Sequence, residues 1–159
     1  EHLEKYEIDK IHVYGLIPQK GTMFEGSPIP SKEEQAWWIA NLRIAFPHVD
    51  IQCGIWDDRA DRVSLLLRAG ANSISKFKAT KLFGTKIAEE IEHQVKIAGR
   101  TFRGTLTILP EINWDEKIQE LSLEESLKEK IKEKLYNEYL IKIQKNKQWK
   151  KQMSLSALK

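Results

Sequence analysis

The side chains in this sequence that could do chemistry lie in or just after three short apolar segments. They are Tyr14, Gln52, Cys53, Lys76, Lys78 and Lys81. A phenol can stack on a ligand or donate a hydrogen bond to it, and ammonium groups can hold a carboxylate or a phosphate. The alternative for Tyr14 is an aromatic that only fills a core, and the alternative for the lysines is a solvated basic loop. Arg100 and Arg103 are a second candidate anion contact.

Metal chemistry is poorly supported by this chain alone. Cys53 is the only cysteine, which excludes an internal disulfide and any iron-sulfur cluster held by several thiolates of this chain. Cys53 is expected to be a small apolar filler behind a sheet. The four histidines show no metal-ligand spacing, and only His12 is expected to face an interior. We therefore assign no metal ligands here.

The composition describes one domain with a tail. The chain has 159 residues, and 26 basic residues against 23 acidic ones give a net charge of only +3, too small to indicate nucleic acid as a partner. No apolar run approaches the ~20 residues that span a bilayer. We expect a cytoplasmic protein without a membrane partner. Because the chain starts with Glu1 in a charged stretch, we also expect it to begin inside something longer.

Apolar periodicity predicts three strands, each followed by a helix. The strands are expected at Ile8–Ile17, Val49–Ile55 and Ala71–Phe77. The first helix opens at Ser31, which with Glu34 has the spacing of a capping box, and it ends near Phe46. The second covers Arg62–Ala69, with Asp57 or Asp58 as its cap and Gly70 at its end, and the third runs from Thr85 to Gly99. Trp37 and Trp38 cannot both face the core of one helix, so we expect one of them to pack in the core and the other to lie at a surface.

Strands that alternate with helices predict a parallel sheet, either an open doubly wound sheet or a barrel. Successive side chains of a strand point to opposite faces. His12, Tyr14, Leu16 and Gln52 are therefore expected on the inner face. Val49, Ile51 and Cys53 are expected against the helices.

The C-terminal part is less specific. Residues 101–113 show the weak alternation of an appended strand or hairpin, and residues 114–150 predict one long helix or two joined helices. Lysines without an intervening acid end the chain: Lys142, Lys145, Lys147, Lys150, Lys151 and Lys159. They predict a solvated basic helix end, and without interleaved aromatics nucleic acid is not expected to bind there. The expected domains are 1–100, 101–113 and 114–159.

Two motifs carry a resemblance to a known family. Lys20-Gly-Thr-Met-Phe-Glu25, followed by Pro28 and Pro30, and then Ala69-Gly-Ala-Asn-Ser-Ile74 resemble the C-terminal barrel half of biotin synthase in order and spacing. Related radical S-adenosylmethionine enzymes, including archaeal lipoyl-synthase groups, share this biotin and thiamin synthesis associated domain. The resemblance covers roughly residues 8–85.

The resemblance implies an α/β fold that is the C-terminal half of a (βα)6 partial TIM barrel, with three parallel strand-helix units and a C-terminal helical extension. Such transferases bind a 4Fe-4S cluster through a CxxxCxxC loop, which would lie outside this chain, and cleave S-adenosylmethionine to a 5′-deoxyadenosyl radical. The backbone of Leu16, Ile17 and Pro18 matches the stretch that contacts the adenine, and Tyr14 matches a substrate contact. Lys76 would lie at the functional mouth.

Gln52 matches the position at which biotin synthase has an arginine ligand of a 2Fe-2S cluster. Glutamine cannot replace that ligand, so we expect a different reaction, with sulfur insertion on a lipoyl-type substrate as the narrower expectation. The missing barrel half would come from the same gene or from a separate subunit.

Two other functions remain open. The chain could be a non-catalytic half-barrel subunit that binds an acidic partner through its basic helix. It could also be a flavodoxin-like doubly wound protein, although no glycine-rich phosphate loop follows any of the three strands.

Overall fold

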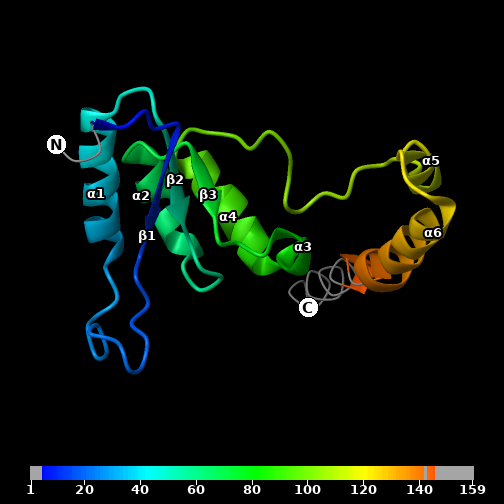
Figure 1. Cartoon of the computed structure of the whole chain (residues 1–159), viewed down its shortest axis with the longest axis horizontal. Coiled ribbons are helices and arrows are strands. Elements are labelled where there is room, and N and C mark those ends of the chain that lie inside the picture. The colour runs from blue at the N-terminus through cyan, green and yellow to red at the C-terminus, as the bar shows by residue number, and fades with distance from the viewer. Residues whose placement is uncertain (1–4, 142, 146–159) are drawn as a thin grey trace, which may run out of the picture. The chain divides into compact units, whose positions relative to one another are not determined.

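The computed structural model describes residues 5–141 and 143–145. The chain forms two compact units. The first contains residues 1–78 and 90–103, and the second contains residues 79–89 and 104–159. Figure 1 traces both units along the chain. Their limits differ from the domain boundaries expected from the sequence, which remain a prediction.

The first unit is an α/β structure around a parallel sheet. Its strands are β1 (Lys10–Tyr14), β2 (Asp50–Gly54) and β3 (Ser73–Ser75), in the order β1-β2-β3. All three run in the same direction, and the register places Tyr14 beside Gly54 and Gly54 beside Ser75. Each strand is shorter than predicted. The carboxyl ends of the strands therefore meet at one edge of the sheet.

The sheet has one apolar and one polar face. Ile51 and Cys53 of β2 are fully buried, and Val63, Leu66 and Ile91 from helices complete the same core. The register places the polar side chains of neighbouring strands together on the other face: Lys10, His12, Tyr14, Asp50, Gln52, Ser73 and Ser75. This confirms the alternation expected for β1 and β2. Because one face is polar along all three strands, it suits ligand binding rather than helix packing.

Helix α1 (Lys32–Ala45) follows β1, and its start is as predicted. The Glu34 amide donates to Ser31 Oγ at 3.1 Å, and the Ser31 amide donates to Glu34 Oε2 at 2.7 Å. Trp37 and Trp38 are 58% and 59% exposed and contact each other edge to face. The expectation that one of them packs in the core is therefore wrong. Ala36 and Ile39 are the buried apolar residues of this helix.

After β2, the 3-10 turn η2 (Ala60–Arg62) leads into α2 (Val63–Arg68). No side chain caps either element, so neither Asp57 nor Asp58 has the predicted capping role. Gly70 then ends α2 with a φ of 119°, as predicted for a residue that follows a helix. Helix α4 (Lys86–Ile97) begins after Thr85, whose Oγ1 accepts a hydrogen bond from the Ala88 amide at 3.4 Å.

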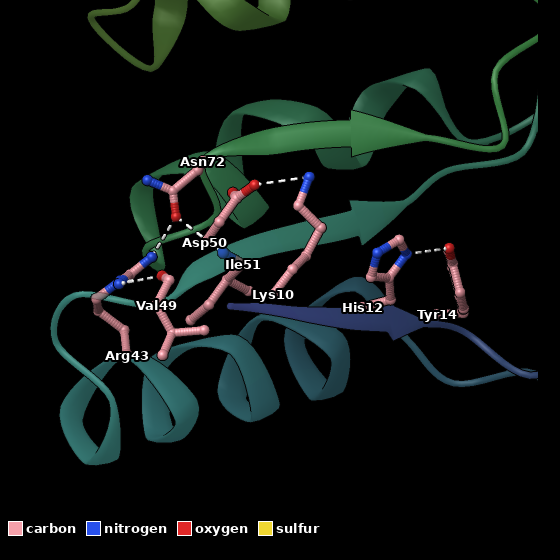
Figure 2. A network of polar contacts seen from close by, with 8 residues as sticks. All are labelled: Lys10, His12, Tyr14, Arg43, Val49, Asp50, Ile51 and Asn72. Atoms are coloured by element: carbon pink, nitrogen blue, oxygen red, sulfur yellow. Dashed lines mark hydrogen bonds and ion pairs between the residues drawn. The ribbon is translucent and has the colours of Figure 1, made fainter. Parts of the chain in front are cut away.

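Arg43 and Asn72 join α1 to the start of the sheet (Figure 2). The Arg43 guanidinium donates to the carbonyl oxygens of Phe46, Pro47, Val49 and Gly70 and to Asn72 Oδ1. Asn72 Oδ1 also accepts from the Ile51 amide at 2.9 Å. Asn72 of the Ala69-Gly-Ala-Asn-Ser-Ile74 motif therefore has a packing role at the amino ends of the strands, while Ser73 of the same motif pairs in register with Gln52.

The second unit is helical. It contains α3 (Ala79–Leu82), α5 (Trp114–Gln119), α6 (Glu125–Lys134) and the π-helix η3 (Leu135–Leu140). The predicted strand or hairpin at 101–113 does not form, since these residues are turns and irregular backbone. Of the two alternatives predicted for residues 114–150, one long helix or two joined helices, the described residues favour the second, since α5 and α6 are separated at residues 120–124. Of the terminal lysines only Lys145 falls within the described residues.

Asp115 of α5 joins α6 and η3. Its carboxylate accepts from Lys132 Nζ at 2.8 Å and from the Tyr136 hydroxyl at 3.3 Å. Lys128 is buried and donates to the Gln119 carbonyl and to Glu125. No helix among the described residues is long and apolar enough to cross a membrane.

Candidate functional site at the carboxyl ends of the strands

Tyr14 lies across Gly54 at the end of the polar face. A Cβ atom added to Gly54 would overlap the Tyr14 ring. Since Gly54 belongs to the central strand, the missing side chain leaves the space in which a ring from β1 can reach over the sheet. The ring stays 43% exposed, so a ligand can reach it.

Two basic side chains fix this ring further. His12 Nδ1 lies 2.6 Å from the Tyr14 hydroxyl oxygen, a short hydrogen bond shown in Figure 2. Lys76 Nζ lies 5.4 Å from the centroid of the ring, within the range of a cation-π contact. Lys76 directly follows β3 and has a φ of 63°, a left-handed conformation that is uncommon for lysine. Residues from β1 and from the end of β3 thus meet above β2.

Other polar groups on this face have different partners. Lys10 pairs with Asp50 at 2.8 Å, and Lys78 pairs with Asp57 at 3.3 Å. Four side-chain oxygens are buried without a hydrogen-bond partner among the described residues: Asp50 Oδ1, Asp57 Oδ1, Ser73 Oγ and Ser75 Oγ. Buried polar atoms without partners are few in native proteins. Of these atoms, Ser75 Oγ belongs to the register partner of Gly54, so unused hydrogen-bonding capacity exists beside Tyr14 and Gly54.

The stretch Leu16-Ile17-Pro18 follows β1 as irregular backbone, one residue after Tyr14. Leu16 is half-exposed and lines an open pocket of about 590 Å³, together with Tyr14, Pro30 and Trp37. Gln19 Nε2 donates to the Ile17 carbonyl at 3.1 Å. Leu16 is exposed and Ile17 and Pro18 are partly exposed, so a ligand could reach this stretch.

Gln35, a residue that the sequence analysis did not single out, joins the ends of two strands. Its Nε2 donates to the Gly54 carbonyl at 2.9 Å and to the Val13 carbonyl at 3.3 Å, while Arg62 Nη1 lies 3.4 Å from its Oε1. Gln35 is 3% exposed. Its signal in the sequence is a polar residue one turn before Ile39, on the core face of α1.

Cys53 lies on the opposite, apolar face. Its side chain is fully buried, and burial raises the pKa of its thiol to about 12. The thiol is therefore protonated at neutral pH and cannot act as a nucleophile or a ready ligand. This agrees with its expected role as an apolar filler. Among the described residues, no group of three or more His, Cys, Asp or Glu side chains could hold a metal ion.

The structure separates the sequence candidates into two places. Tyr14 and Lys76 meet, whereas Gln52 lies two residues before Gly54 on β2, beside His12 and Ser73. Gln52 lines another cavity of about 620 Å³, together with Arg100, Arg103, Lys10 and Asp50. These arginines therefore do not join Tyr14 and Lys76.

Comparisons with known proteins give one relative of unknown activity. An uncharacterized protein of Methanocaldococcus jannaschii is 37% identical over 105 residues, which are 66% of this chain. The chain spans 29% of the length of that protein. No family model and no solved structure matches the chain.

Proposed function

We propose that this chain is the C-terminal half of a partial TIM barrel in a radical S-adenosylmethionine enzyme of the biotin-synthase-like group. The observation that carries the proposal is the polar face of the parallel sheet, which ends in Tyr14, Gly54 and Lys76. In parallel α/β proteins, ligands bind at the carboxyl ends of the strands. The motifs that begin at Lys20 and Ala69 also support the proposal, because they resemble the C-terminal barrel half of biotin synthase.

The open edge of β1 supports a barrel that continues beyond this chain. Among the described residues β1 pairs only with β2, so the outer backbone groups of β1 have no strand beside them. Exposed strand edges favour pairing with another strand. The exposed Trp37 and Trp38 lie near this edge, in the pocket that Val13 and Tyr14 also line. A preceding strand-helix unit would cover both the edge and the indoles.

The residues present fit the cofactor that the family uses. Leu16, Ile17 and Pro18 are irregular backbone that would lie against the adenine of S-adenosylmethionine, and Gln35 bonds the ends of β1 and β2. S-adenosylmethionine and a 4Fe-4S cluster held outside this chain would supply the radical chemistry that removes a hydrogen atom from the substrate. This chain's own residues would bind and orient the substrate and exclude water.

Tyr14, Gln52 and Lys76 would contact that substrate from the polar face. The phenol and the amide can donate hydrogen bonds, and the ammonium supplies positive charge. Sulfur insertion of the lipoyl or biotin type is the narrower reaction that we propose. We also propose a cytoplasmic location, where a free cysteine such as Cys53 stays reduced.

The test is anaerobic reconstitution of this chain, together with the segment or subunit that carries the CxxxCxxC loop, followed by an assay for 5′-deoxyadenosine. We expect release of 5′-deoxyadenosine from S-adenosylmethionine. Failure to form it with a fully assembled cluster would overturn the proposal.

Two variants of Ile17 test the adenine contact that we assign to this chain. Ile17→Pro removes a backbone N–H next to Pro18 and should weaken binding of S-adenosylmethionine. Ile17→Ala keeps the backbone and should bind it almost as well as the wild type. Equal binding by both variants would remove the adenine contact from this stretch.

A further inference from the structure

We infer that Lys76 and Tyr14 form a binding site for a carboxylate group, with His12 as the positioning residue of the phenol. The inference deepens the proposed function. It rests on that function in one respect, which is that the bound carboxylate is taken to be a group of the substrate. His12 had no role in the sequence analysis beyond facing the interior.

The charges on the polar face single out Lys76. Lys10 Nζ lies 2.8 Å from the Asp50 carboxylate, and Lys78 Nζ lies 3.3 Å from the Asp57 carboxylate. Within the part of the chain that the structure describes, no acidic side chain pairs with Lys76, and the Tyr14 ring is its charged group's only contact. Of Lys10, Lys76 and Lys78, only Lys76 therefore offers an anionic ligand an ammonium without a carboxylate partner among the described residues.

The backbone conformation of Lys76 also supports a ligand site at this residue. A non-glycine residue at a φ of 63° is in a strained conformation that persists only where its surroundings hold it. Here the conformation ends β3 and brings the ammonium over the ring of Tyr14, two strands away. Strained residues of this kind cluster at ligand sites, which makes the position a candidate on geometry as well as on charge.

Tyr14 supplies the second contact because its hydroxyl is already oriented. The ring lies on Gly54, and the hydroxyl oxygen lies 2.6 Å from His12 Nδ1. When Nδ1 carries the hydrogen, the imidazole donates to the phenol oxygen and leaves the phenol O–H for the ligand. His12 then acts through Tyr14 and does not itself touch the carboxylate.

The number of charges favours a carboxylate over a phosphate. One ammonium balances the single charge of a carboxylate, whose two oxygens can accept from Lys76 and from Tyr14 separately. A phosphate carries about two charges near neutral pH and is usually held by several cations or backbone amides. The contact between Lys76 and Tyr14 supplies one ammonium and one hydroxyl, which matches the two oxygens of a carboxylate.

Hexanoate is a suitable probe, because it has one carboxylate and a chain that can lie against Tyr14 and Leu16. The full 159-residue chain is titrated with hexanoate and followed by two-dimensional NMR. We expect saturable shifts at the Tyr14 ring and the Gly54 and Lys76 amides. Hexanamide, which lacks the charge, and inorganic phosphate should each bind at least about tenfold more weakly, since a charge-assisted hydrogen bond contributes ~1.5–3 kcal/mol.

Variants at the mouth give matched controls. Lys76→Asn removes the charge while asparagine tolerates the left-handed backbone, and it should weaken hexanoate binding about tenfold. Lys76→Arg should restore most of the affinity, and Lys78→Asn, at a lysine that is already paired, should leave it unchanged. Tyr14→Phe should weaken binding by a smaller factor.

His12 is tested by conservative rescue. His12→Asn retains a donor near the Nδ1 position and should bind hexanoate nearly as well as the wild type, whereas His12→Leu should behave like Tyr14→Phe. If His12→Leu bound hexanoate as the wild type does, His12 would have no positioning role.

Three results would overturn the carboxylate site. They are equal binding of hexanoate by the wild type and Lys76→Asn, tighter binding of phosphate than of hexanoate, and equal binding of hexanamide. Should a variant fail to fold, the comparison of the three ligands on the wild-type chain still decides the question. Hexanoate binding without formation of 5′-deoxyadenosine would sink the proposed function alone, and 5′-deoxyadenosine without hexanoate binding would sink this inference alone.

Discussion

The aromatic ring of Tyr14 occupies the space in which a side chain of Gly54 would stand. The two residues are register partners on adjacent parallel strands, and Gly54 is the last residue of the central strand. Gly54 does not have a positive φ, so its backbone conformation does not require glycine. Glycine is required because any side chain at this position would overlap the Tyr14 ring. The position of Tyr14 therefore depends directly on the absence of a Cβ atom at residue 54.

Gly54→Ala should displace the Tyr14 ring and cost about 1–3 kcal/mol of unfolding free energy, the usual range for overpacking. The same substitution in a Tyr14→Ala background should cost much less, because the clash partner is gone. Urea denaturation of the four proteins of this double-mutant cycle measures the coupling. Additive effects would show that the ring does not lie on Gly54 in solution.

Arg43→Lys should destabilise the first unit by about 2 kcal/mol or more, since a lysine cannot reproduce the fork that reaches several carbonyl oxygens. Asn72→Asp keeps an acceptor oxygen for Arg43 and for the Ile51 amide, so it should be tolerated better than Asn72→Ala. Thermal unfolding gives the comparison, and Arg68→Lys, at an exposed position of α2, is the control. Equal melting temperatures for Arg43→Lys and Arg68→Lys would contradict the structure.

Cys53 should resist alkylation by iodoacetamide at pH 8 in the folded protein and react after denaturation. Its raised pKa also makes stability depend on pH. Between the ordinary thiol pKa of 9.0 and about 12, the unfolded chain loses this proton and the folded chain keeps it. Stability should therefore fall as pH rises above 9, with a slope of up to ~1.4 kcal/mol per pH unit from this group. In Cys53→Ala that part of the slope should vanish between pH 9 and 10.5, and an unchanged slope would refute the assignment.

Asp115 should hold α5 against α6 in a pH-dependent way. Hydrogen bonding from Lys132 lowers the pKa of the Asp115 carboxyl below 3.8, and the same contact raises the pKa of Lys132. The ion pair therefore stabilises the second unit above the ordinary pKa of Asp115, and this contribution is lost as pH falls through the lowered value. NMR titration of the carboxyl should show the lowered pKa in the wild type and its return towards 3.8 in Lys132→Met, with Lys134→Met as control.

Local rules predicted the elements of the first unit well. The Ser31 and Glu34 capping box, the ends of helices at Gly70 and Gly99, and the opposite faces of Gln52 and Cys53 follow from neighbours in sequence, and the structure has them. The hairpin at 101–113 failed because its weak alternation has no neighbouring strand to pair with among the described residues. The cap at Asp57 or Asp58 failed because the helical segment starts at Ala60, which puts Arg59 at the N-cap position.

The amino-acid sequence by itself thus determines the alternation of strands and helices, the helix caps and the side of the sheet on which each strand residue lies. These depend on backbone propensity and on a period of two, which act over a few neighbouring positions. The meeting of Tyr14, His12 and Lys76 above Gly54 was decided only by the tertiary structure. It depends on the register of three parallel strands and on one missing Cβ atom, and residues about sixty positions apart come into contact only when that register is formed.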